Sequence, residues 1–311
     1  MKQVFIDGDK GTTGLRIADR LSQRQDIALI RLPEALRKDP AARKEALNQA
    51  DIAFLCLPDD AAREAAAMIE NDTTAVIDTS TAHRTAEGWT YGFPEIGNRR
   101  KLLPTAKRIA NPGCHASGFI ALVAPLVEQG LLSPQTALSC FSLTGYSGGG
   151  KKMIAEYEAP GRSALLDAPR QYGLNQSHKH LPEMQAVCGL DVPPIFCPIV
   201  APYYAGMEVT VTLFGGDVKG GKKEIEELYA AYYTQGLVRF CRDSAEGGFL
   251  SAGAWAGRDD MEITVLGNED RLLLVSRFDN LGKGASGAAI QNMNLLLGAE
   301  ETEGLVTGAS I

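Results

Sequence analysis

The N-terminal stretch Lys2–Leu21 reads KQVFIDGDKGTTGLRIADRL, which joins an apolar run, a glycine-rich turn and an amphipathic segment. The pattern predicts a strand over Lys2–Ile6, a loop that contains Gly8, Gly11 and Gly14, and then a helix. Glycines at this place let the backbone turn sharply and approach a pyrophosphate, which then accepts hydrogen bonds from helix N–H groups. A turn with close helix–sheet packing alone is the alternative, because the spacing G-x-x-G-x-x-G differs from the commoner G-x-G-x-x-G.

Strands and helices alternate from the N-terminus to about Asp78. Short apolar runs predict strands over residues 27–32, 51–57 and 75–78, and Ala-rich segments predict helices over residues 40–50 and 59–70. This alternation indicates a parallel sheet with helices on both faces. The near-continuous apolar strands agree with burial on both sides.

The pattern changes after about Pro112, where the predicted strands become longer and more alternating: 207–213, 261–266 and 272–278. A final amphipathic segment over residues 285–297 is expected to be a helix that packs on the first domain. We therefore expect an α/β protein. A doubly wound, Rossmann-like dinucleotide-binding domain would cover residues 1–112 and 285–311, and an α+β catalytic and dimerisation domain with a mostly antiparallel sheet would cover residues 113–284.

Length and composition exclude several classes of protein. The 311 residues suit two domains at roughly 150 residues each, and 45% hydrophobic with 22% charged residues is ordinary for a globular chain. The 31 Lys and Arg against 38 Asp and Glu give a net charge of −7, and no basic run offers a local patch to nucleic acid.

No apolar run reaches the ~18 residues that a membrane helix needs, and the N-terminus lacks a signal-peptide pattern. The six cysteines include no C-x-x-C pair, which favours reduced thiols. We therefore expect a cytoplasmic protein.

The end of the second predicted strand bears on cofactor choice. The chain there reads Ile30-Arg31-Leu32. An NAD site usually carries Asp or Glu at this point to hold the ribose 2′-hydroxyl, whereas a nearby Arg accommodates a 2′-phosphate. Arg31 therefore favours NADP, and a solvated arginine at a strand end is the alternative.

One cysteine lies in a context that indicates chemistry. Asn111–Gly118 reads NPGCHASG and precedes an apolar stretch. Pro and Gly just before the predicted helix place Cys114 at or near its N-terminus, where the helix dipole and unpaired N–H groups stabilise a thiolate. The same N–H groups can hold the oxyanion that forms when a thiolate attacks a carbonyl. Cys114 is the candidate nucleophile, with simple burial as the alternative, and the other five cysteines are predicted to be small core residues.

Two of the four histidines occur in the segment SHKHLPE over residues 177–183. On a helical turn His180 and Glu183 would share a face, so that the carboxylate orients the imidazole for acid–base chemistry. A surface histidine pair is the alternative. No third ligand lies at a recognisable spacing for zinc, so no metal is expected.

Two further loops carry polar groups. DTSTAHR, over residues 78–84, follows a strand at the carboxyl end where α/β proteins bind ligands. SGGGKK, over residues 147–152, combines backbone donors with cations and suits an anion. Either segment can also be an ordinary loop.

The segments GDKGTTGL, YGFPEI, NPGCHASG, YSGGGKK, SHKHLPE and DNLGKGASGAAIQNMNLLLG span nearly the whole chain in order. Together they resemble the short form of the N-acetyl-γ-glutamyl-phosphate reductase family of arginine biosynthesis. The longer form usually has an aromatic residue after the cysteine, where this chain has His115. The resemblance implies an NADPH-dependent oxidoreductase that reduces an acyl phosphate to an aldehyde through a Cys114 thioester.

The resemblance also implies roles for individual residues. Cys114 matches the nucleophile, and His180 most resembles the acid/base, with His178 and Glu183 in the same pocket. Arg84 and Lys151 are candidates for binding the anionic groups of the substrate. The implied dinucleotide contacts are Gly8, Gly11, Thr12, Thr13 and Gly14 in the glycine loop, with Ser80, Ser147, Gly148 and Asn280 near the nicotinamide.

The expected ligands are therefore NADP, a small-molecule substrate and phosphate, with no nucleic-acid or membrane partner and with a homo-oligomer, dimer or tetramer, as the assembly. Two alternatives stay open. One is a related acyl-phosphate reductase of the aspartate or lysine pathway, and the other, less favoured, is a non-catalytic dinucleotide sensor. Which of His178 and His180 is the acid/base also stays open.

Overall fold

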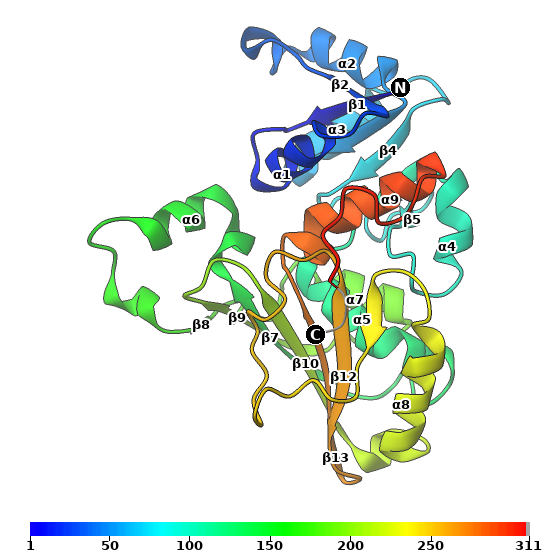
Figure 1. Ribbon diagram of the computed structural model, residues 1–311, viewed down its shortest axis with the longest axis vertical. Helices are drawn as coiled ribbons and strands as arrows, with labels where there is room; N and C mark the ends of the chain where they lie inside the picture. The colour runs from blue at the N-terminus through cyan, green and yellow to red at the C-terminus, as the bar shows by residue number, and fades with distance from the viewer. Residues whose placement is uncertain (309–311) are drawn as a thin grey trace. The chain divides into compact units, whose positions relative to one another are not determined.

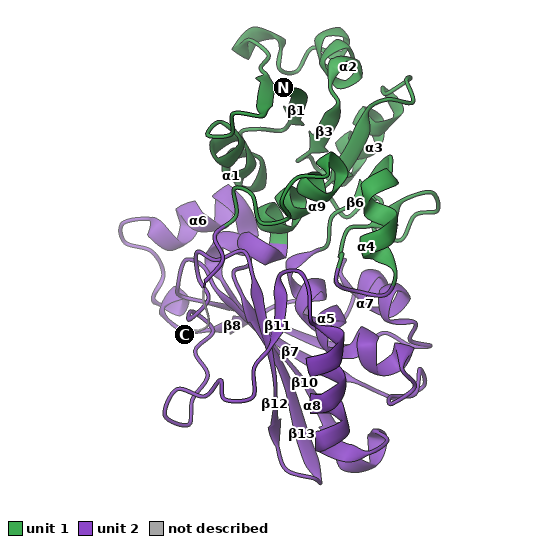
Figure 2. Cartoon of the chain, turned by 45° about the vertical axis from the view of Figure 1, so that its right-hand side comes forward, with its two compact units in different colours: residues 1–94, 98–112, 285–305 green, residues 95–97, 113–284, 306–311 purple. Residues whose placement is uncertain are grey.

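The computed structural model describes residues 1–308, and contacts divide the chain into two compact units (Figure 2). Unit 1 comprises Met1–Pro94, Asn98–Pro112 and Ala285–Leu305. Unit 2 comprises Glu95–Gly97, Gly113–Gly284 and a segment that begins at Val306. Each unit has its own sheet.

Unit 1 is built on a six-stranded, fully parallel sheet with the order β2-β1-β3-β4-β6-β5 (Figure 1). Its strands are β1 (Lys2–Asp7), β2 (Ile27–Ile30), β3 (Ile52–Leu55), β4 (Ala75–Asp78), β5 (Thr90–Tyr91) and β6 (Arg108–Ala110). Its α-helices are α1 (Thr12–Leu21), α2 (Pro40–Gln49), α3 (Asp59–Ala67), α4 (Arg99–Leu102) and α9 (Gly287–Leu297).

Helices cover both faces of this sheet. Val4 and Ile6 of β1 pack in one apolar cluster with residues of α1 and α9, whereas Phe5 packs in another with residues of α2 and α3. Alternate residues of a strand point to opposite faces, so both faces are buried. The predicted doubly wound fold is confirmed, and the C-terminal helix completes its core through Ile290 and Met293.

Unit 2 contains a seven-stranded mixed sheet with the order β11-β12-β13-β10-β7-β9-β8. The pairs β11–β12 and β7–β9 are parallel, and the other neighbours are antiparallel. Its strands are β7 (Ser139–Gly145), β8 (Arg170–Gln171), β9 (Ile195–Ala201), β10 (Met207–Phe214), β11 (Val238–Phe240), β12 (Met261–Gly267) and β13 (Arg271–Phe278). Its α-helices are α5 (Cys114–Glu128), α6 (Gly150–Glu158), α7 (Leu181–Cys188) and α8 (Gly221–Tyr232).

The helix α5 lies directly on one face of this sheet. A Cβ built on Gly118 would come within 2.5 Å of the Val209 side chain of β10, so only glycine allows this approach. Strand alternation leaves Phe141, Ile195 and Leu273 exposed on the opposite face.

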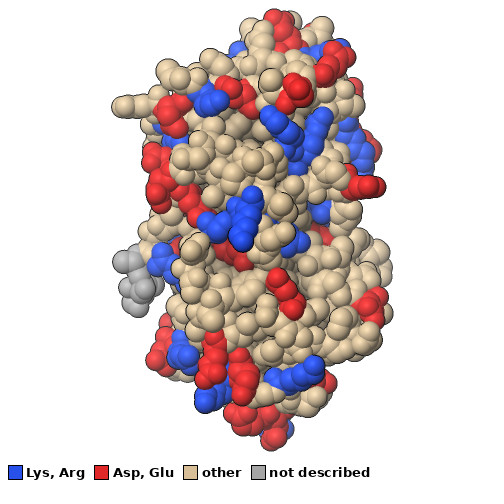
Figure 3. Space-filling view, turned by 90° about the vertical axis from the view of Figure 1, so that its right-hand side faces the viewer, with Lys and Arg blue, Asp and Glu red and all other residues tan. Residues whose placement is uncertain are grey.

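Within residues 1–308, no helix is long and apolar enough to cross a bilayer. Basic and acidic side chains are interspersed on the face drawn in Figure 3.

A buried ion pair in unit 2 holds the first residues of the helical turn η6 (Gly282–Ser286) in place. The Lys283 ammonium lies 2.9 Å from both carboxylate oxygens of Glu95, and Glu95 also accepts a hydrogen bond of 2.7 Å from the Leu237 amide. Both charged side chains are 2% exposed or less. Two charges this deeply buried hold their place only when paired with each other and hydrogen-bonded.

We therefore expect Lys283→Met to lower the free energy of unfolding by about 3–5 kcal/mol, because Glu95 keeps its buried charge without its cation. Urea titration followed by circular dichroism measures the loss. The double variant Glu95→Gln/Lys283→Met should regain most of it, since Gln still accepts from the Leu237 amide. A single variant as stable as wild type would show that the pair contributes nothing.

Candidate active site

Cys114 is the first residue of α5, and extended Gly113 (φ −83°, ψ 147°) is its N-cap. The predicted helix start is confirmed. The thiol is half-buried, and it lies where backbone N–H groups have no acceptor within the helix. The Ser117 hydroxyl donates to the Gly113 carbonyl over 3.0 Å and braces this first turn. The arrangement suits a thiolate nucleophile.

A buried carboxylate from α7 holds the loop before the cysteine. The Gly113 amide donates to Oε1 of Glu183 over 2.8 Å, and Glu183 is 1% exposed. Glu183 lies in the first turn of α7, and His180 is the N-cap of that helix. The helical turn predicted for His180 and Glu183 is present. The contact of Glu183 with the backbone before Cys114 was not predicted, because it joins residues far apart in sequence.

Three histidine rings gather in unit 2. The centroid of the His115 ring lies 5.8 Å from that of His178 and 5.6 Å from that of His180, and the latter two lie 4.8 Å apart. The His180 amide donates to Nδ1 of His178 over 3.2 Å, so that nitrogen carries no proton in this arrangement. The Phe196 ring packs 5.3 Å from His115 and closes one side of the cluster.

His115 bridges two hydroxyl groups, a role that the sequence did not reveal. Its Nδ1 lies 2.6 Å from the Ser142 hydroxyl and its Nε2 lies 2.7 Å from the Tyr172 hydroxyl. Burial first, and then the repulsion that a protonated His178 would exert, lower the pKa of His115 to about 3. The imidazole is therefore neutral at physiological pH. The position of His115 directly after Cys114 is a signal for such a role in the sequence, whereas nothing in the sequence around Tyr172 indicates this contact.

A glycine lies against the Cβ atom of Cys114. A Cβ built on Gly284 would lie 2.9 Å from Cβ of Cys114. The chain before it is fixed by Asp279, whose Oδ1 accepts from the amides of Leu281 and Gly282 over 2.6 and 2.9 Å. The buried Lys283–Glu95 pair secures the same turn. Space beside Cys114 therefore depends on this turn.

The structure brings together Ser147, Gly148 and Asn280, three of the predicted cofactor contacts. The Asn280 side chain donates to the Ser147 hydroxyl and accepts from the Gly206 amide, both over 3.0 Å. A Cβ on Gly148 would lie 3.4 Å from Nδ2 of Asn280. Their role toward a cofactor stays a prediction. Lys151 is exposed on α6.

The loop after β4 in unit 1 is held by the buried Asp78. The Ser80 hydroxyl donates to Asp78 over 2.8 Å, and Nδ1 of His83 lies 2.6 Å from the same carboxylate. Arg84 donates from Nε to the Asn111 carbonyl over 3.0 Å. These bonds fix the loop at the carboxyl end of the sheet, where α/β proteins bind ligands. The roles of Ser80 and Arg84 stay predictions.

The glycine loop lies where the strand order of unit 1 reverses, between β1 and β3. Gly8 has φ of +93°, and a Cβ there would lie 2.3 Å from the Cys56 carbonyl oxygen. A Cβ on Gly14 would lie 2.4 Å from the Gly8 carbonyl oxygen. Gly11 is the N-cap of α1, which begins with Thr12 and Thr13. A cavity of about 500 Å³ opens beside this loop, bordered by Gly8, Gly11 and the end of β2.

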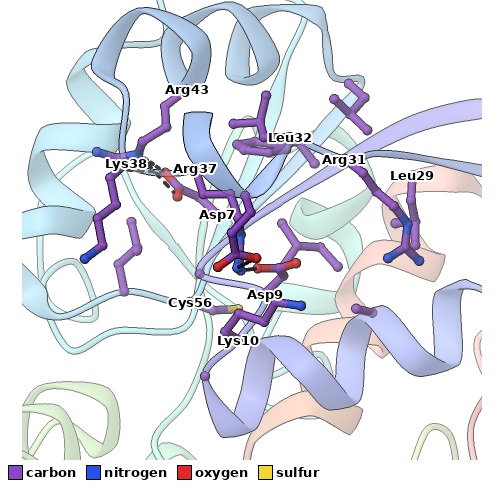
Figure 4. A pocket seen from close by; sticks show the side chains of 18 of the residues that line it. Asp7, Asp9, Lys10, Leu29, Arg31, Leu32, Arg37, Lys38, Arg43 and Cys56 are labelled. Carbon is purple, nitrogen blue, oxygen red and sulfur yellow. Dashed lines mark hydrogen bonds and ion pairs between the residues drawn. The ribbon is translucent and has the colours of Figure 1, made fainter.

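Cations surround the end of β2 in this cavity (Figure 4). Arg43 pairs with Asp7 over 2.9 Å, and Arg37 pairs with Asp9. Burial raises the pKa of Asp7 despite that pairing. Arg31, on the other side of the cavity beside Leu29 in Figure 4, forms no ion pair within residues 1–308, nor does Lys38 (which also lines the cavity).

The prediction that the other five cysteines are core residues is wrong for three of them. Cys140 and Cys188 are buried, but Cys56, Cys197 and Cys241 are half-buried. Cys197 lies on β9 among residues of alternating exposure, and Cys56 and Cys241 each follow the end of a strand, where side chains are less buried.

In the part of the chain that the structure describes, no three His, Cys, Asp or Glu side chains are grouped as a metal site.

Comparison with known proteins agrees with this arrangement. The family described as "Semialdehyde dehydrogenase, NAD binding domain" matches residues 3–103, and "Semialdehyde dehydrogenase, dimerisation domain" matches residues 114–280. A crystal structure of aspartate semialdehyde dehydrogenase II from Vibrio cholerae has the same fold, with a TM-score of 0.72 and 16% identity over 96% of this chain and 98% of that one. The protein is thus of the semialdehyde dehydrogenase class, with a domain for a nicotinamide dinucleotide.

Sequence relatives define the family more narrowly. N-acetyl-gamma-glutamyl-phosphate reductase 2 of Nostoc sp. (strain PCC 7120) is 43% identical over 97% of this chain and 99% of its own length. N-acetyl-gamma-glutamyl-phosphate reductase of Chelativorans sp. (strain BNC1) is 46% identical over 95% and 98%. The chain belongs to the N-acetyl-γ-glutamyl-phosphate reductase family, and the predicted resemblance is confirmed.

The buried, neutral His115 makes stability depend on pH. The unfolded chain takes up a proton here near pH 6.5, whereas the folded protein takes it up only near pH 3. The stability gained from this group is therefore complete above pH 6.5 and is lost as the pH falls toward 3. Between pH 7 and pH 5, wild type should lose about 2 kcal/mol more unfolding free energy than His115→Phe.

Urea titrations of both proteins at the two pH values give this difference, because titrating groups common to both cancel. Parallel losses in wild type and His115→Phe would contradict the assignment of a neutral imidazole.

Proposed function

We propose that this protein reduces N-acetyl-γ-glutamyl phosphate to N-acetylglutamate semialdehyde with release of phosphate, as an enzyme of arginine biosynthesis. The observation that carries the proposal is the half-buried thiol at the first turn of α5, beside a histidine-bearing helix end. Relatives more than 40% identical over nearly the whole chain bear the name of this activity.

In the first step, the Cys114 thiolate attacks the acyl carbon of the substrate. The carbon–sulfur bond forms, the bond from carbon to the phosphate oxygen breaks, and phosphate leaves. N–H groups at the start of α5 would stabilise the oxyanion of the tetrahedral adduct. The thioester that results keeps the acyl group on the protein.

His180 serves as the acid/base in the second half of the reaction. Its imidazole donates a proton to the oxygen of the thiohemiacetal and takes it back when the adduct collapses to the aldehyde and the free thiolate. His178 already uses Nδ1 as an acceptor for the His180 amide. His178 is therefore assigned to substrate contact, together with Glu183, Arg84 and Lys151.

The residues around the glycine loop fit a dinucleotide. Gly8 and Gly14 leave no room for side chains where the backbone closes the cavity, and the N-terminus of α1 follows directly. Gly8, Gly11, Thr12, Thr13 and Gly14 would hold the pyrophosphate, and Ser80, Ser147, Gly148 and Asn280 would contact the nicotinamide side. When bound, the reduced dinucleotide supplies the hydride for the thioester.

NADP is the proposed form of the cofactor. Arg31 and Lys38 line the cavity at the end of β2 without acidic partners in the described chain. Asp7, Asp9 and Glu34, carboxylates that line the cavity, are each paired with an arginine, so none of them is left to hold a ribose 2′-hydroxyl. A 2′-phosphate would find cations here.

Self-association through the open face of the unit 2 sheet is also proposed. The strand register places Leu273, Phe141, Leu143, Ile195 and Ile199 on this face. All lie within the segment matched by the family described as a dimerisation domain. A second copy of the chain would cover this apolar surface.

A cytoplasmic location is proposed as well. The six free cysteines agree with a reducing compartment such as the cytoplasm.

The proposed function is tested first by Cys114→Ser. We expect loss of turnover with retained NADPH binding, since a serine hydroxyl stays protonated where a thiol ionises. The assay measures NADP⁺ reduction with N-acetylglutamate semialdehyde and phosphate, and cofactor fluorescence reports binding. Aspartate semialdehyde as substrate tests the related pathway.

His180→Asn is the matched variant, because it keeps the thiol and should lower kcat by ~10²–10⁴. A Cys114→Ser enzyme within tenfold of wild type would exclude the thioester route. An inactive wild type that binds NADPH would favour the sensor.

Arg31→Asp should shift the ratio of kcat/KM for NADP(H) against NAD(H) toward NAD(H) by roughly ten- to a hundredfold, the value of one charge-assisted contact. Lys38→Asp is the companion variant at the same cavity. An unchanged ratio in Arg31→Asp with a shifted ratio in Lys38→Asp would assign the phosphate contact to Lys38 instead.

Phe141→Lys should weaken self-association by roughly thirtyfold or more, the cost of losing an aromatic anchor at an interface centre. Sedimentation velocity over a range of concentrations measures the change. Leu102→Lys, at a similarly exposed apolar residue on α4 of unit 1, is the control and should leave the assembly intact.

A further inference from the structure

A short segment just before β12 packs directly against the turn η6. The Gly257 amide donates to Oδ2 of Asp279 over 2.5 Å, and the other oxygen of that carboxylate accepts from the Gly282 amide over 2.9 Å. A Cβ built on Gly282 would come within 1.9 Å of the Arg258 carbonyl oxygen and 3.1 Å of Oδ1 of Asp259. The start of the turn therefore has this segment as its support.

The same segment holds the tail of the described chain, residues 306–308. The Asp259 amide donates to the Val306 carbonyl over 2.7 Å, and Oδ2 of Asp259 accepts from the Val306 amide over 2.8 Å. The Gly308 carbonyl accepts from Arg239 over 3.2 Å. The fully buried Asp259 thus has one carboxylate oxygen beside Gly282 of the turn and the other on the tail.

Arg258 makes this support rigid. Its guanidinium donates to both carboxylate oxygens of the buried Asp260, over 2.8 and 2.7 Å, and lies 3.8 Å from the centroid of the Trp255 ring. It also lies against Gly308, where a Cβ would come within 2.5 Å of Cζ. A planar group held by two parallel hydrogen bonds and an aromatic face keeps one orientation. Asp259 is therefore attached to backbone that moves little.

Two residues beyond Gly282, the turn reaches the nucleophile. The Gly284 amide donates to the Asp279 carbonyl over 3.0 Å, and a Cβ on Gly284 would lie 2.9 Å from Cβ of Cys114. A shift of the turn at Gly282 therefore changes the room beside Cys114. A misplacement of about 1 Å in a reacting group can cost up to ~100-fold in rate.

We propose that Asp259 is a positioning residue for the Cys114 site, which holds the turn η6 against the nucleophile and uses the tail as its second support. It acts through the turn and is assigned no contact with the substrate. Residues 285–305 leave unit 2 at this turn and return to it at the tail, so one carboxylate holds the backbone at both ends of that segment. This inference rests on the proposed function for its turnover readout only.

The test removes the bond between Asp259 and the tail from either side. Val306→Pro has no N–H to donate, and Asp259→Asn replaces one of the two carboxylate acceptors by a donor. Each single variant should lower kcat by roughly ten- to a hundredfold, with a smaller effect on KM. The double variant should lose no more than the weaker single one, because both changes break the same bond.

Val306→Ala is the matched control for the tail. It keeps the backbone amide that donates to Asp259, and the valine side chain that it shortens is 53% exposed. This variant should therefore retain the kcat of wild type, whereas Val306→Pro should not.

A second readout does not require substrate. The rate at which iodoacetamide alkylates Cys114 at one fixed pH, followed by mass spectrometry of its peptide, should rise in Asp259→Asn and Val306→Pro by roughly three- to tenfold, the equilibrium effect of one hydrogen bond. Tyr233→Phe controls for lost stability, because it removes a hydroxyl that donates to the Ala121 carbonyl of α5 over 2.6 Å. It should leave kcat and the alkylation rate unchanged.

The proposal is overturned if Asp259→Asn and Val306→Pro keep both kcat and the alkylation rate within about twofold of wild type, the scatter expected between independent sites. It is also overturned if their losses multiply in the double variant, or if Val306→Ala or Tyr233→Phe reproduces them.

Failure of the proposed function gives a different result. It would appear as an active Cys114→Ser enzyme, or as wild type without reductase activity. The alkylation rates would still decide whether Asp259 and the tail position the turn beside Cys114.

Discussion

A buried hydrogen bond from the Gly113 amide to Glu183 ties the start of α5 to the first turn of α7. Because Cys114 follows Gly113 and His180 precedes α7, this bond sets the nucleophile and the proposed acid/base relative to each other. A carboxylate buried to this degree needs a donor, and a helix start offers amides that have no other acceptor. Helix α5, which carries the thiol, packs closely against the unit 2 sheet at Gly118.

Glycines that permit close contacts shape the other parts of the proposed site. Gly284 lies against Cys114 where any side chain would collide, and Gly8 and Gly14 bring the backbone together at the reversal point of the unit 1 sheet. These positions differ in purpose from the polar ones. The glycines permit close contacts that a side chain would prevent, whereas the Lys283–Glu95 pair and the Ser142–His115–Tyr172 hydrogen bonds orient side chains within unit 2.

Local patterns in the sequence predicted the elements well. The strand Ala75–Asp78 and the helix start at Cys114 are as expected, because burial on both faces and a Pro-Gly punctuation are local signals. Element ends were overestimated, as for the helix expected to reach Glu70 that ends at Ala67. Met68 and Ile69 continue the apolar stretch beyond the last helical residue, so hydrophobicity alone did not mark the end.

Contacts between distant segments were not predictable. Glu95 and Lys283 are 188 residues apart, and each reads in sequence as an ordinary surface charge. Tyr172 reaches His115 only because β8 and β9 pair in one register, which no single segment encodes.

Whether Cys114 carries the acyl group is tested most directly by mass spectrometry of the wild-type protein. The protein is mixed with enzymatically generated N-acetyl-γ-glutamyl phosphate in the absence of dinucleotide. An acyl adduct on the Cys114 peptide that hydroxylamine removes is the predicted result, and an active enzyme that acquires no adduct there, or acquires it on another cysteine, would contradict it.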